Sequence, residues 1–458
     1  MTDDLRSASR EVLPDGYFAG RTIANLAAAL RARRISSVDL IGIALDEAER
    51  SQAKINAFVT IDGAGARDAA AKADRELATG VDRGPLHGVP VAVKDMIDVR
   101  GQPTTAGSLH LTNRIADRDA DAVARLRHAG AVLIGKTATH EFANGPTGDR
   151  AARGPTRNPR ALGHMAGGSS SGSAAAVAAG VVPVALGTDT GGSVRIPAAC
   201  CGVVGVRTTK GVISTRGVLP LANSMDTVGV LAGCVADAHV VLSAMIGYLQ
   251  PLTKRALVAD ARVGWIPPGS FHLTQSSITR SARDLVAPFV IEEVDLPGAH
   301  ELRFSYRVIQ GREAHVVHAE RLRRAPELYD SEVRERLQTG SSYTDSQFSQ
   351  ATEVREQFSV QIAHLLRRVN FLALPTIPFP PPKLFSRRVN VGDQPVEVPT
   401  GLLSLTAPWS LVGLPAISIP AAHVDGLPAG VQIVGRPHAE AELLSFAAQL
   451  ESQRLVGG

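Results

Sequence analysis

The chain has 458 residues and a mass of 48.1 kDa, which is too long for one small hydrophobic core. Its apolar fraction of 44%, its charged fraction of 20% and its 43 glycines are typical of a compact globular protein with many tight turns, and they exclude a disordered chain. The formal net charge of +4 is small for this length, and no dense Lys/Arg run is interleaved with aromatic residues. We therefore expect no nucleic-acid partner.

The three cysteines, Cys200, Cys201 and Cys234, do not form a disulfide framework pattern, because their number is odd and two are adjacent. This favours a reducing compartment. Residues 1–10 lack the basic and hydrophobic regions of a secretory signal, and Gly and Pro interrupt the longest apolar stretches before they reach membrane-spanning length. We expect a cytoplasmic protein without a membrane partner.

The predicted elements begin with a helical segment over residues 22–50, in which Ser36 and Asp39 form a capping-box start. The following stretches alternate between strands, expected at 89–93, 131–135, 181–187, 261–266 and 369–375, and helices, expected at 122–130, 173–179 and within 300–366. This alternation predicts a sheet with helices on its faces. No composition break marks a linker, so we expect one α/β/α domain over residues 1–458.

Residues 130–137, GAVLIGKT, match the phosphate-loop pattern of nucleotidases letter for letter. A phosphate loop follows a strand, has small flexible residues at its centre and opens a helix. Here Gly130 follows a helical stretch, and residues 131–134 have the pattern of a buried strand. We interpret Gly130 as the end of a helix, which disfavours a nucleotidase.

Other short motifs are incomplete. Ser51 and Lys54 fit the S-x-x-K pattern of penicillin-binding enzymes, but no accompanying S-D-N or K-T-G element is present. His140 and Glu141 begin like a zinc-protease helix, but Asn144 stands where the second histidine belongs. No G-x-S-x-G motif occurs, so we expect neither a metal site nor a Ser-His-Asp triad.

Residues 163–202 contain two Gly-Gly-Ser loops, at 167–169 and 191–193. The first precedes an Ala-rich helix, so one of the serines at 169–171 is expected to cap that helix. In the second loop, successive backbone N–H groups could converge on one oxygen, as an oxyanion hole requires.

A serine nucleophile needs a base, and lysine is the candidate because no histidine is well placed and arginine does not lose its proton. The chain has only seven lysines among 48 basic residues, and Lys94 ends the apolar strand 89–93. A lysine that is desolvated there can be neutral. The alternative is a structural lysine paired with Asp95 or Asp98.

The motifs GVPVAVKD (88–95), GGSSSGS (167–173) and GTDTGGSVRIPA (187–198), in this order and spacing, resemble the amidase signature family. Similarity extends through GKTATHEFA (135–143), GLPAISIP (413–420) and GVQIVG (430–435), so it covers nearly the whole chain. The resemblance implies a signature core over residues 84–235 and a variable helical segment near the substrate pocket over residues 300–366.

This resemblance implies a large mixed, mostly parallel twisted sheet with helices on both faces, and a Ser-Ser-Lys triad without a cofactor. Ser193 is expected to be the nucleophile, Ser169 the bridging serine entered through a cis peptide from Gly168, and Lys94 the base. The oxyanion hole is expected from the N–H groups of Thr190, Gly191, Gly192 and Ser193, with support from Ser170, Asp189 and Arg195.

The family also contains the glutamine-handling subunit of tRNA-dependent amidotransferases, in which an Asp is expected to hold the substrate ammonium. This chain has Leu403 at that position and Ser410 in place of a following Asn, so we expect a stand-alone amidase with a neutral, fairly apolar small-molecule substrate. Carbamate or ester hydrolysis remains open, as does a binding-only protein. Pocket walls are expected from 139–149, 300–345 and 403–412. The oligomeric state is open, with a homodimer possible.

Overall fold

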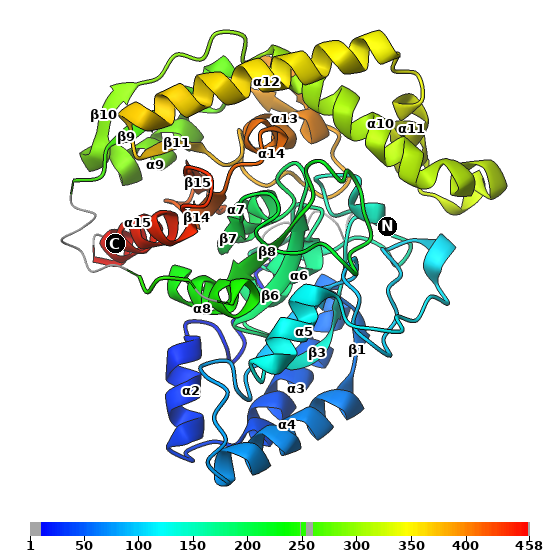
Figure 1. Ribbon diagram of the computed structural model, residues 1–458, viewed down its shortest axis with the longest axis vertical. Helices are drawn as coiled ribbons and strands as arrows, with labels where there is room; N and C mark the ends of the chain where they lie inside the picture. Colours follow the sequence, from blue (N-terminus) through cyan, green and yellow to red (C-terminus); the bar gives the residue numbers. More distant parts are fainter. Residues whose placement is uncertain (1–10, 248, 253–259, 457–458) are drawn as a thin grey trace.

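The computed structural model describes residues 11–247, 249–252 and 260–456 (Figure 1). Residues 1–10, which we interpreted as lacking a secretory signal, lie outside the described residues. Within these ranges, no helix is long and apolar enough to cross a membrane.

A mixed sheet of eleven strands runs through the molecule, in the order β1-β3-β2-β6-β8-β7-β14-β15-β11-β9-β10. The strands are β1 (Phe58–Ile61), β2 (Pro90–Lys94), β3 (Val132–Thr137), β6 (Val184–Asp189), β7 (Val204–Arg207), β8 (Thr227–Ala232), β9 (Val263–Trp265), β10 (Val290–Glu293), β11 (Phe371–Pro375), β14 (Ala416–Pro420) and β15 (Gly430–Val434). Two small sheets pair β4 (Arg157–Asn158) with β5 (Ala161–Met165), and β12 (Arg388–Val391) with β13 (Gln394–Glu397).

The pairing within the large sheet is more antiparallel than expected. Parallel pairs join β2 to β3 and β6, and β9 to β10 and β11. The other described pairs in this sheet are antiparallel. Strand β8 follows β7, and β15 follows β14, without an intervening helix, and such direct connections give antiparallel neighbours. The mixed α/β fold is as predicted, but the balance differs from a mostly parallel sheet.

The α-helices cover the sheet and cap one end of the molecule. They are α2 (Ile23–Arg31), α3 (Ser37–Ile55), α4 (Gly63–Ala78), α5 (Asp121–His128), α6 (Ser171–Ala178), α7 (Arg195–Cys201), α8 (Val235–Ile246), α9 (Ser276–Val286), α10 (Glu301–Arg324), α11 (Ser331–Gly340), α12 (Asp345–Arg368), α13 (Val398–Ser404), α14 (Ala407–Leu411) and α15 (Glu440–Val456). Short 3₁₀ turns are η2 (Leu109–Leu111), η3 (Glu141–Ala143), η5 (Pro268–Ser270), η6 (Ala287–Phe289) and η7 (Pro326–Leu328). In Figure 1, α2–α4 lie at one end of the long axis and α10 and α12 at the other.

Local signals in the sequence account for several boundaries. The capping box of Ser36 and Asp39 is present at the start of α3, as predicted, although the expected segment 22–50 is divided into α2 and α3. Gly130 has a φ of +82° just after α5 and leads into β3. The letters of the phosphate-loop pattern are therefore a helix end and a strand, which confirms the sequence interpretation.

Helix α6 lies in the centre of the molecule and carries the first Gly-Gly-Ser loop at its N-terminus. All eight of its residues are buried, and it packs against β2, β6 and α7. Its Ala and Gly residues are small enough for this close approach to the sheet. Ser170 occupies the N-cap position, but its side chain makes no capping hydrogen bond.

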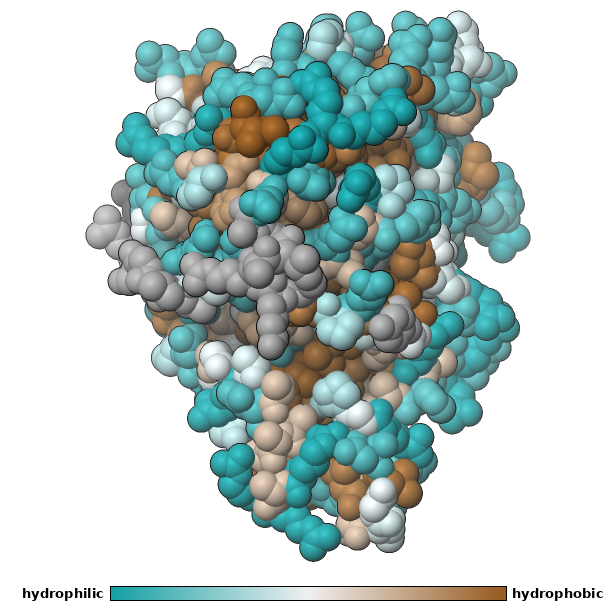
Figure 2. All heavy atoms as spheres, turned by 60° about the vertical axis from the view of Figure 1, so that its left-hand side comes forward, coloured by the Kyte–Doolittle hydropathy of each residue, from teal (hydrophilic) through white to brown (hydrophobic). Residues whose placement is uncertain are grey.

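On the face in Figure 2, hydrophilic side chains predominate and apolar ones form scattered areas.

Candidate active site

Lys94 ends strand β2, between β3 and β6, and its side chain is completely buried. Its Nζ atom donates hydrogen bonds to Ser169 Oγ at 2.8 Å and to Thr188 Oγ1 at 2.7 Å. The structural alternative does not hold, because Asp95 contacts Lys136 and Asp98 contacts Arg114. Lys94 has hydroxyl partners, and the sequence analysis missed one of them, Thr188.

Burial lowers the pKa of Lys94 from 10.5 to about 7, against the opposing effect of Asp189 and Asp226. Desolvation disfavours the charged ammonium, and neither carboxylate is within ion-pair distance of Nζ among the described residues. A lysine with this pKa is substantially neutral near pH 7 and above. The amine can then accept a proton from the hydroxyl group it contacts.

Ser169 lies just before helix α6, within hydrogen-bonding distance of Lys94. The peptide between Gly168 and Ser169 is cis, as predicted. The Ser169 carbonyl accepts a hydrogen bond from the backbone N–H of His140 at 3.1 Å. One hydrogen bond therefore fixes the Ser169 hydroxyl beside the lysine, and another fixes its backbone carbonyl.

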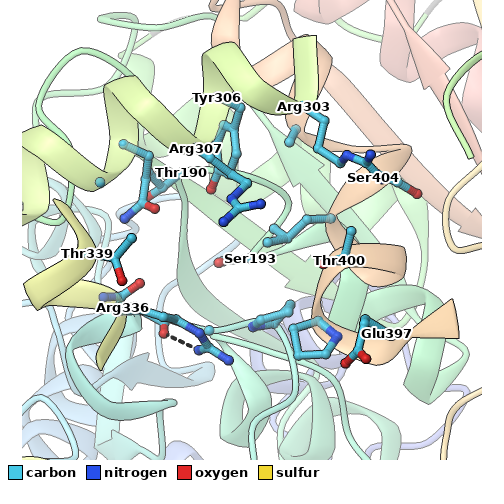
Figure 3. A pocket seen from close by; sticks show the side chains of 18 of the residues that line it. Thr190, Ser193, Arg303, Tyr306, Arg307, Arg336, Thr339, Glu397, Thr400 and Ser404 are labelled. Atoms are coloured by element: carbon cyan, nitrogen blue, oxygen red, sulfur yellow. Dashed lines mark hydrogen bonds between the residues drawn. The ribbon is translucent and has the colours of Figure 1, made fainter. Parts of the chain in front are cut away.

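Ser193 lies in the loop between β6 and α7 and lines a cavity (Figure 3). Its carbonyl accepts a hydrogen bond from the N–H of Ser170 at 3.1 Å, which ties the two Gly-Gly-Ser loops together. The Ser193 hydroxyl has no hydrogen-bond partner in the part of the chain that the structure describes. A direct bond from Ser193 to the Ser169 hydroxyl, which the bridging role expected for Ser169 implies, is therefore not formed in this conformation.

Asp189 fixes the loop that carries Ser193. Its carboxylate accepts hydrogen bonds from the backbone N–H groups of Gly192, at 2.9 Å, and Val194, at 3.2 Å. It also pairs with Arg195 and Arg207, at 2.9 and 3.1 Å, and all three charged side chains are buried. These partners hold the pKa of Asp189 well below its usual range. The pinning by Asp189 and Arg195 matches the prediction, whereas Arg207 was missed.

Two expected supporting roles differ in the structure. The N–H of Gly192 donates to Asp189 and is not available to an oxyanion, whereas those of Thr190, Gly191 and Ser193 have no partner among the described residues. The Ser170 hydroxyl contacts the backbone of Thr188, at 3.2 and 3.3 Å, and not Ser169. A hydrogen-bond donor that is already paired cannot stabilise a developing charge, so the oxyanion hole is reduced to three candidate N–H groups.

Both positions before Ser193 are glycines that pack closely against neighbouring helices. A Cβ atom at Gly191 would lie 2.1 Å from the hydroxyl of Tyr306, and one at Gly192 would lie 2.1 Å from Thr406 Oγ1. Gly192 also has a φ of +135°, which side-chain-bearing residues rarely adopt. The two glycines thus let α10 and α14 approach the loop that carries Ser193.

The cavity above Ser193 has a volume of about 470 Å³. Its walls include segments within the three predicted ranges: 143–146, most of the lining between 299 and 343, and 403–408. The structure adds Glu397, Pro399, Thr400, Phe271, Leu221 and Arg387, which the sequence analysis missed. Leu403, expected in place of an Asp, lines the cavity and lies close to Gly191.

Charged side chains line this cavity together with apolar ones. Glu332 pairs with Arg336 and Arg387, and Glu397 pairs with Arg388. Arg336 also donates to the backbone carbonyl of Asn144 at 2.8 Å (Figure 3). The cavity is therefore more polar than the fairly apolar pocket expected from the sequence. Within the described ranges, no group of His, Cys, Asp and Glu side chains could hold a metal ion.

Comparison with known proteins agrees with this geometry. A family model described as Amidase matches residues 39–444. Curated relatives include the glutamyl-tRNA(Gln) amidotransferase subunits A of Aromatoleum aromaticum, 36% identical over 94% of this chain and 96% of the relative, and of Symbiobacterium thermophilum, 34% identical over 91% and 93%.

Solved structures give the same result. A structure described as an amidase is 36% identical, with a TM-score of 0.87 over 94% of this chain and 100% of that chain. The peptide amidase of Stenotrophomonas maltophilia is 27% identical, with a TM-score of 0.79 over 96% and 98%. The chain therefore belongs to the amidase family, whose members act on C–N bonds.

Proposed function

We propose that this protein is an amidase that hydrolyses a linear amide of a small molecule through an acyl-enzyme on Ser193. The observation that carries the proposal is the buried contact of 2.8 Å between Lys94 Nζ and Ser169 Oγ, next to a loop whose Ser193 opens into a cavity. A lysine whose pKa is lowered to about 7 supplies the base that a serine nucleophile needs.

The proposed reaction begins when neutral Lys94 accepts the Ser169 proton and Ser169 accepts the Ser193 proton. This relay requires the Ser193 hydroxyl to rotate toward Ser169. The Ser193 oxygen then bonds to the amide carbon, and the carbonyl oxygen takes the negative charge. When the C–N bond breaks, the amine leaves with the proton returned through the relay. Water then cleaves the ester of Ser193 by the same steps and releases the acid.

The N–H groups of Thr190, Gly191 and Ser193 are the candidate donors to the oxyanion. Their free state among the described residues supports this role. Asp189 and its two arginines hold the loop before substrate arrives, so little reorganisation is needed when charge develops. Preorganised donors of this kind typically contribute about 3 kcal/mol each to transition-state stabilisation.

Carbamate or ester hydrolysis is the alternative within the same chemistry, since both substrates acylate a serine. Amidotransferase subunit activity is a second candidate because the first curated relatives carry that name. Leu403 disfavours glutamine, since a hydrophobic residue there provides no partner for an ammonium group. Leu403 fits the neutral, apolar substrate expected from the sequence, but the charged cavity residues do not.

The test uses Ser193→Ala and a panel of p-nitroanilide, primary amide, carbamate, ester and glutamine substrates. We expect Ser193→Ala to lower kcat by more than about 10⁴-fold without loss of thermal stability, and to abolish labelling by a fluorophosphonate. Ser452→Ala, at an exposed serine of α15, is the matched control and should retain both properties. Residual activity of Ser193→Ala within tenfold of the parent would rule out the proposed nucleophile.

A further inference from the structure

One face of helix α10 points hydrogen-bond donors into the cavity above Ser193. Arg303, Arg307 and Gln310 line the cavity, and their spacing of four and three residues puts them on one side of the helix. In Figure 3, Arg307 extends from α10 toward the middle of the cavity, above Ser193. The helix is anchored beside the nucleophile loop because Tyr306 abuts Gly191.

These donors have no acceptor among the described residues. Neither Arg303 nor Arg307 has an ion-pair or hydrogen-bond partner there, and the buried Nε2 atom of Gln310 is unpaired as well. The other two cavity arginines differ in this respect, since Arg336 and Arg387 pair with Glu332.

The unpaired charge of the cavity is positive. Glu335 on α11 is the one lining carboxylate without an ion-pair partner among the described residues, because Glu332 and Glu397 are paired. Two unpaired guanidinium groups therefore stand against one unpaired carboxylate. An arginine presents a planar fork of N–H groups that matches a carboxylate, and a charge-assisted bond of this kind is about twice as strong as a neutral one.

We propose that Arg303, Arg307 and Gln310 form a subsite for a carboxylate of the substrate, so that the amide cleaved by Ser193 belongs to a molecule with an anionic group away from the scissile bond. This rests on the proposed amidase function and narrows its substrate class. It replaces the neutral substrate expected from the sequence.

The experiment compares two matched pairs of amides. In the first pair, the 4-nitroanilide of glutaric acid carries the carboxylate on the acyl side, and that of pentanoic acid has a methyl group in its place. In the second pair, 4-(pentanoylamino)benzoate carries it on the amine side, and pentananilide lacks it. Equilibrium binding is measured to Ser193→Ala, which cannot turn the amides over, and kcat/KM is measured with the parent enzyme.

We expect the charged member of at least one pair to bind at least about tenfold more tightly than its neutral partner. The substitution Arg307→Met should reduce this ratio of affinities to less than about threefold. Arg323→Met is the matched control: Arg323 is on the same helix, is paired with Glu320 and lies outside the cavity, so it should leave the preference unchanged. The pair that shows the preference locates the carboxylate on the acyl or the amine side.

Equal binding of charged and neutral members in both pairs would overturn the subsite, as would an unchanged preference in Arg307→Met. A preference in binding without turnover of any amide by the parent enzyme would support the subsite and count against the proposed function. Thermal melting of each variant identifies a variant that does not fold. Arg303→Met then provides a second variant of the same subsite, for which the same loss of preference is expected.

Discussion

Two buried lysines on neighbouring strands show how surroundings decide the role of a residue. Lys136 on β3 contacts Asp95 Oδ1 at 3.3 Å, Thr104 Oγ1 and the carbonyl of Pro103. Lys94 on β2 has two hydroxyl partners and, among the residues that the structure describes, no carboxylate within ion-pair distance. A carboxylate at close range favours the charged form, whereas hydroxyl groups compensate for burial much less. Lys94 is thus the lysine suited to accept a proton.

Activity is expected to rise with pH through an apparent pKa near 7. Burial lowers the pKa of Lys94 to about 7, and only its unprotonated form, which increases as the pH rises, can act as the base. Lys94→Arg keeps the charge but cannot lose its proton, so it should be as inactive as Lys94→Ala. The measurement is kcat/KM between about pH 5.5 and 9.5, the range that brackets this pKa. Substantial activity of Lys94→Arg would reduce Lys94 to a structural role.

The candidate triad positions could be singled out because each is marked by local sequence: a basic residue that ends an apolar strand, or a serine after two glycines. Their roles followed from the family resemblance. Partners from distant segments could not. Arg207 is separated from Asp189 by strand β8, and their contact depends on the strand order. The signal that identified Lys94 was nevertheless present at Arg207, which ends the apolar strand β7. The pairing of the Gly192 N–H had no local signal, since it depends on how the loop folds around Asp189.

The helical segment predicted over 300–366 contains three helices, α10, α11 and α12. Its composition predicted helix, but not the breaks at 325–330 and 341–344 or the packing of the helices against each other. Helices α10 and α11 meet at two glycines: a Cβ atom at Gly340 would lie 2.1 Å from the carbonyl oxygen of Gly311. Both helices supply cavity residues, so this contact sets the distance between two walls.

Gly340→Ala is expected to push α11 away from α10. Because the added methyl group would meet backbone and not a movable side chain, we expect a loss of about 1 to 3 kcal/mol in the free energy of unfolding. The KM for the best substrate should rise as the walls separate. Chemical denaturation and steady-state kinetics measure the two effects.

Gly63→Ala, at the start of α4, is the matched control, since a Cβ atom there has nothing within 4 Å. It should leave the free energy of unfolding within about 1 kcal/mol of the parent and KM unchanged. If Gly340→Ala behaved like this control, the close packing of α10 and α11 would have no part in shaping the cavity.

At the scale of the whole molecule, residues from widely separated parts of the chain make up the site. The candidate triad and its loop come from β2, the start of α6 and the segment between β6 and α7, whereas most of the cavity walls come from 143–146, α10, α11, α13 and α14. The alignments with the curated relatives cover 91 to 95% of this chain and 92 to 97% of each relative. The single domain over 1–458 and the possible homodimer stay predictions.

The purified chain is expected to hydrolyse its amide substrate without another kind of subunit. The reason is that the candidate base, bridging serine, nucleophile and oxyanion donors all belong to this chain, and that Leu403 makes glutamine a poor substrate. Turnover of the amide panel and of glutamine is measured on the chain produced alone, with its mass in solution determined by light scattering. Activity that scales linearly with protein concentration, at a constant mass, would support catalysis by this chain. Efficient hydrolysis of glutamine in preference to every other amide would instead favour the amidotransferase subunit and contradict the prediction.

The variant Leu403→Asp tests the same point from the opposite direction. Because the new carboxylate can pair with an ammonium group, the rate of glutamine hydrolysis should increase relative to that of the other amides.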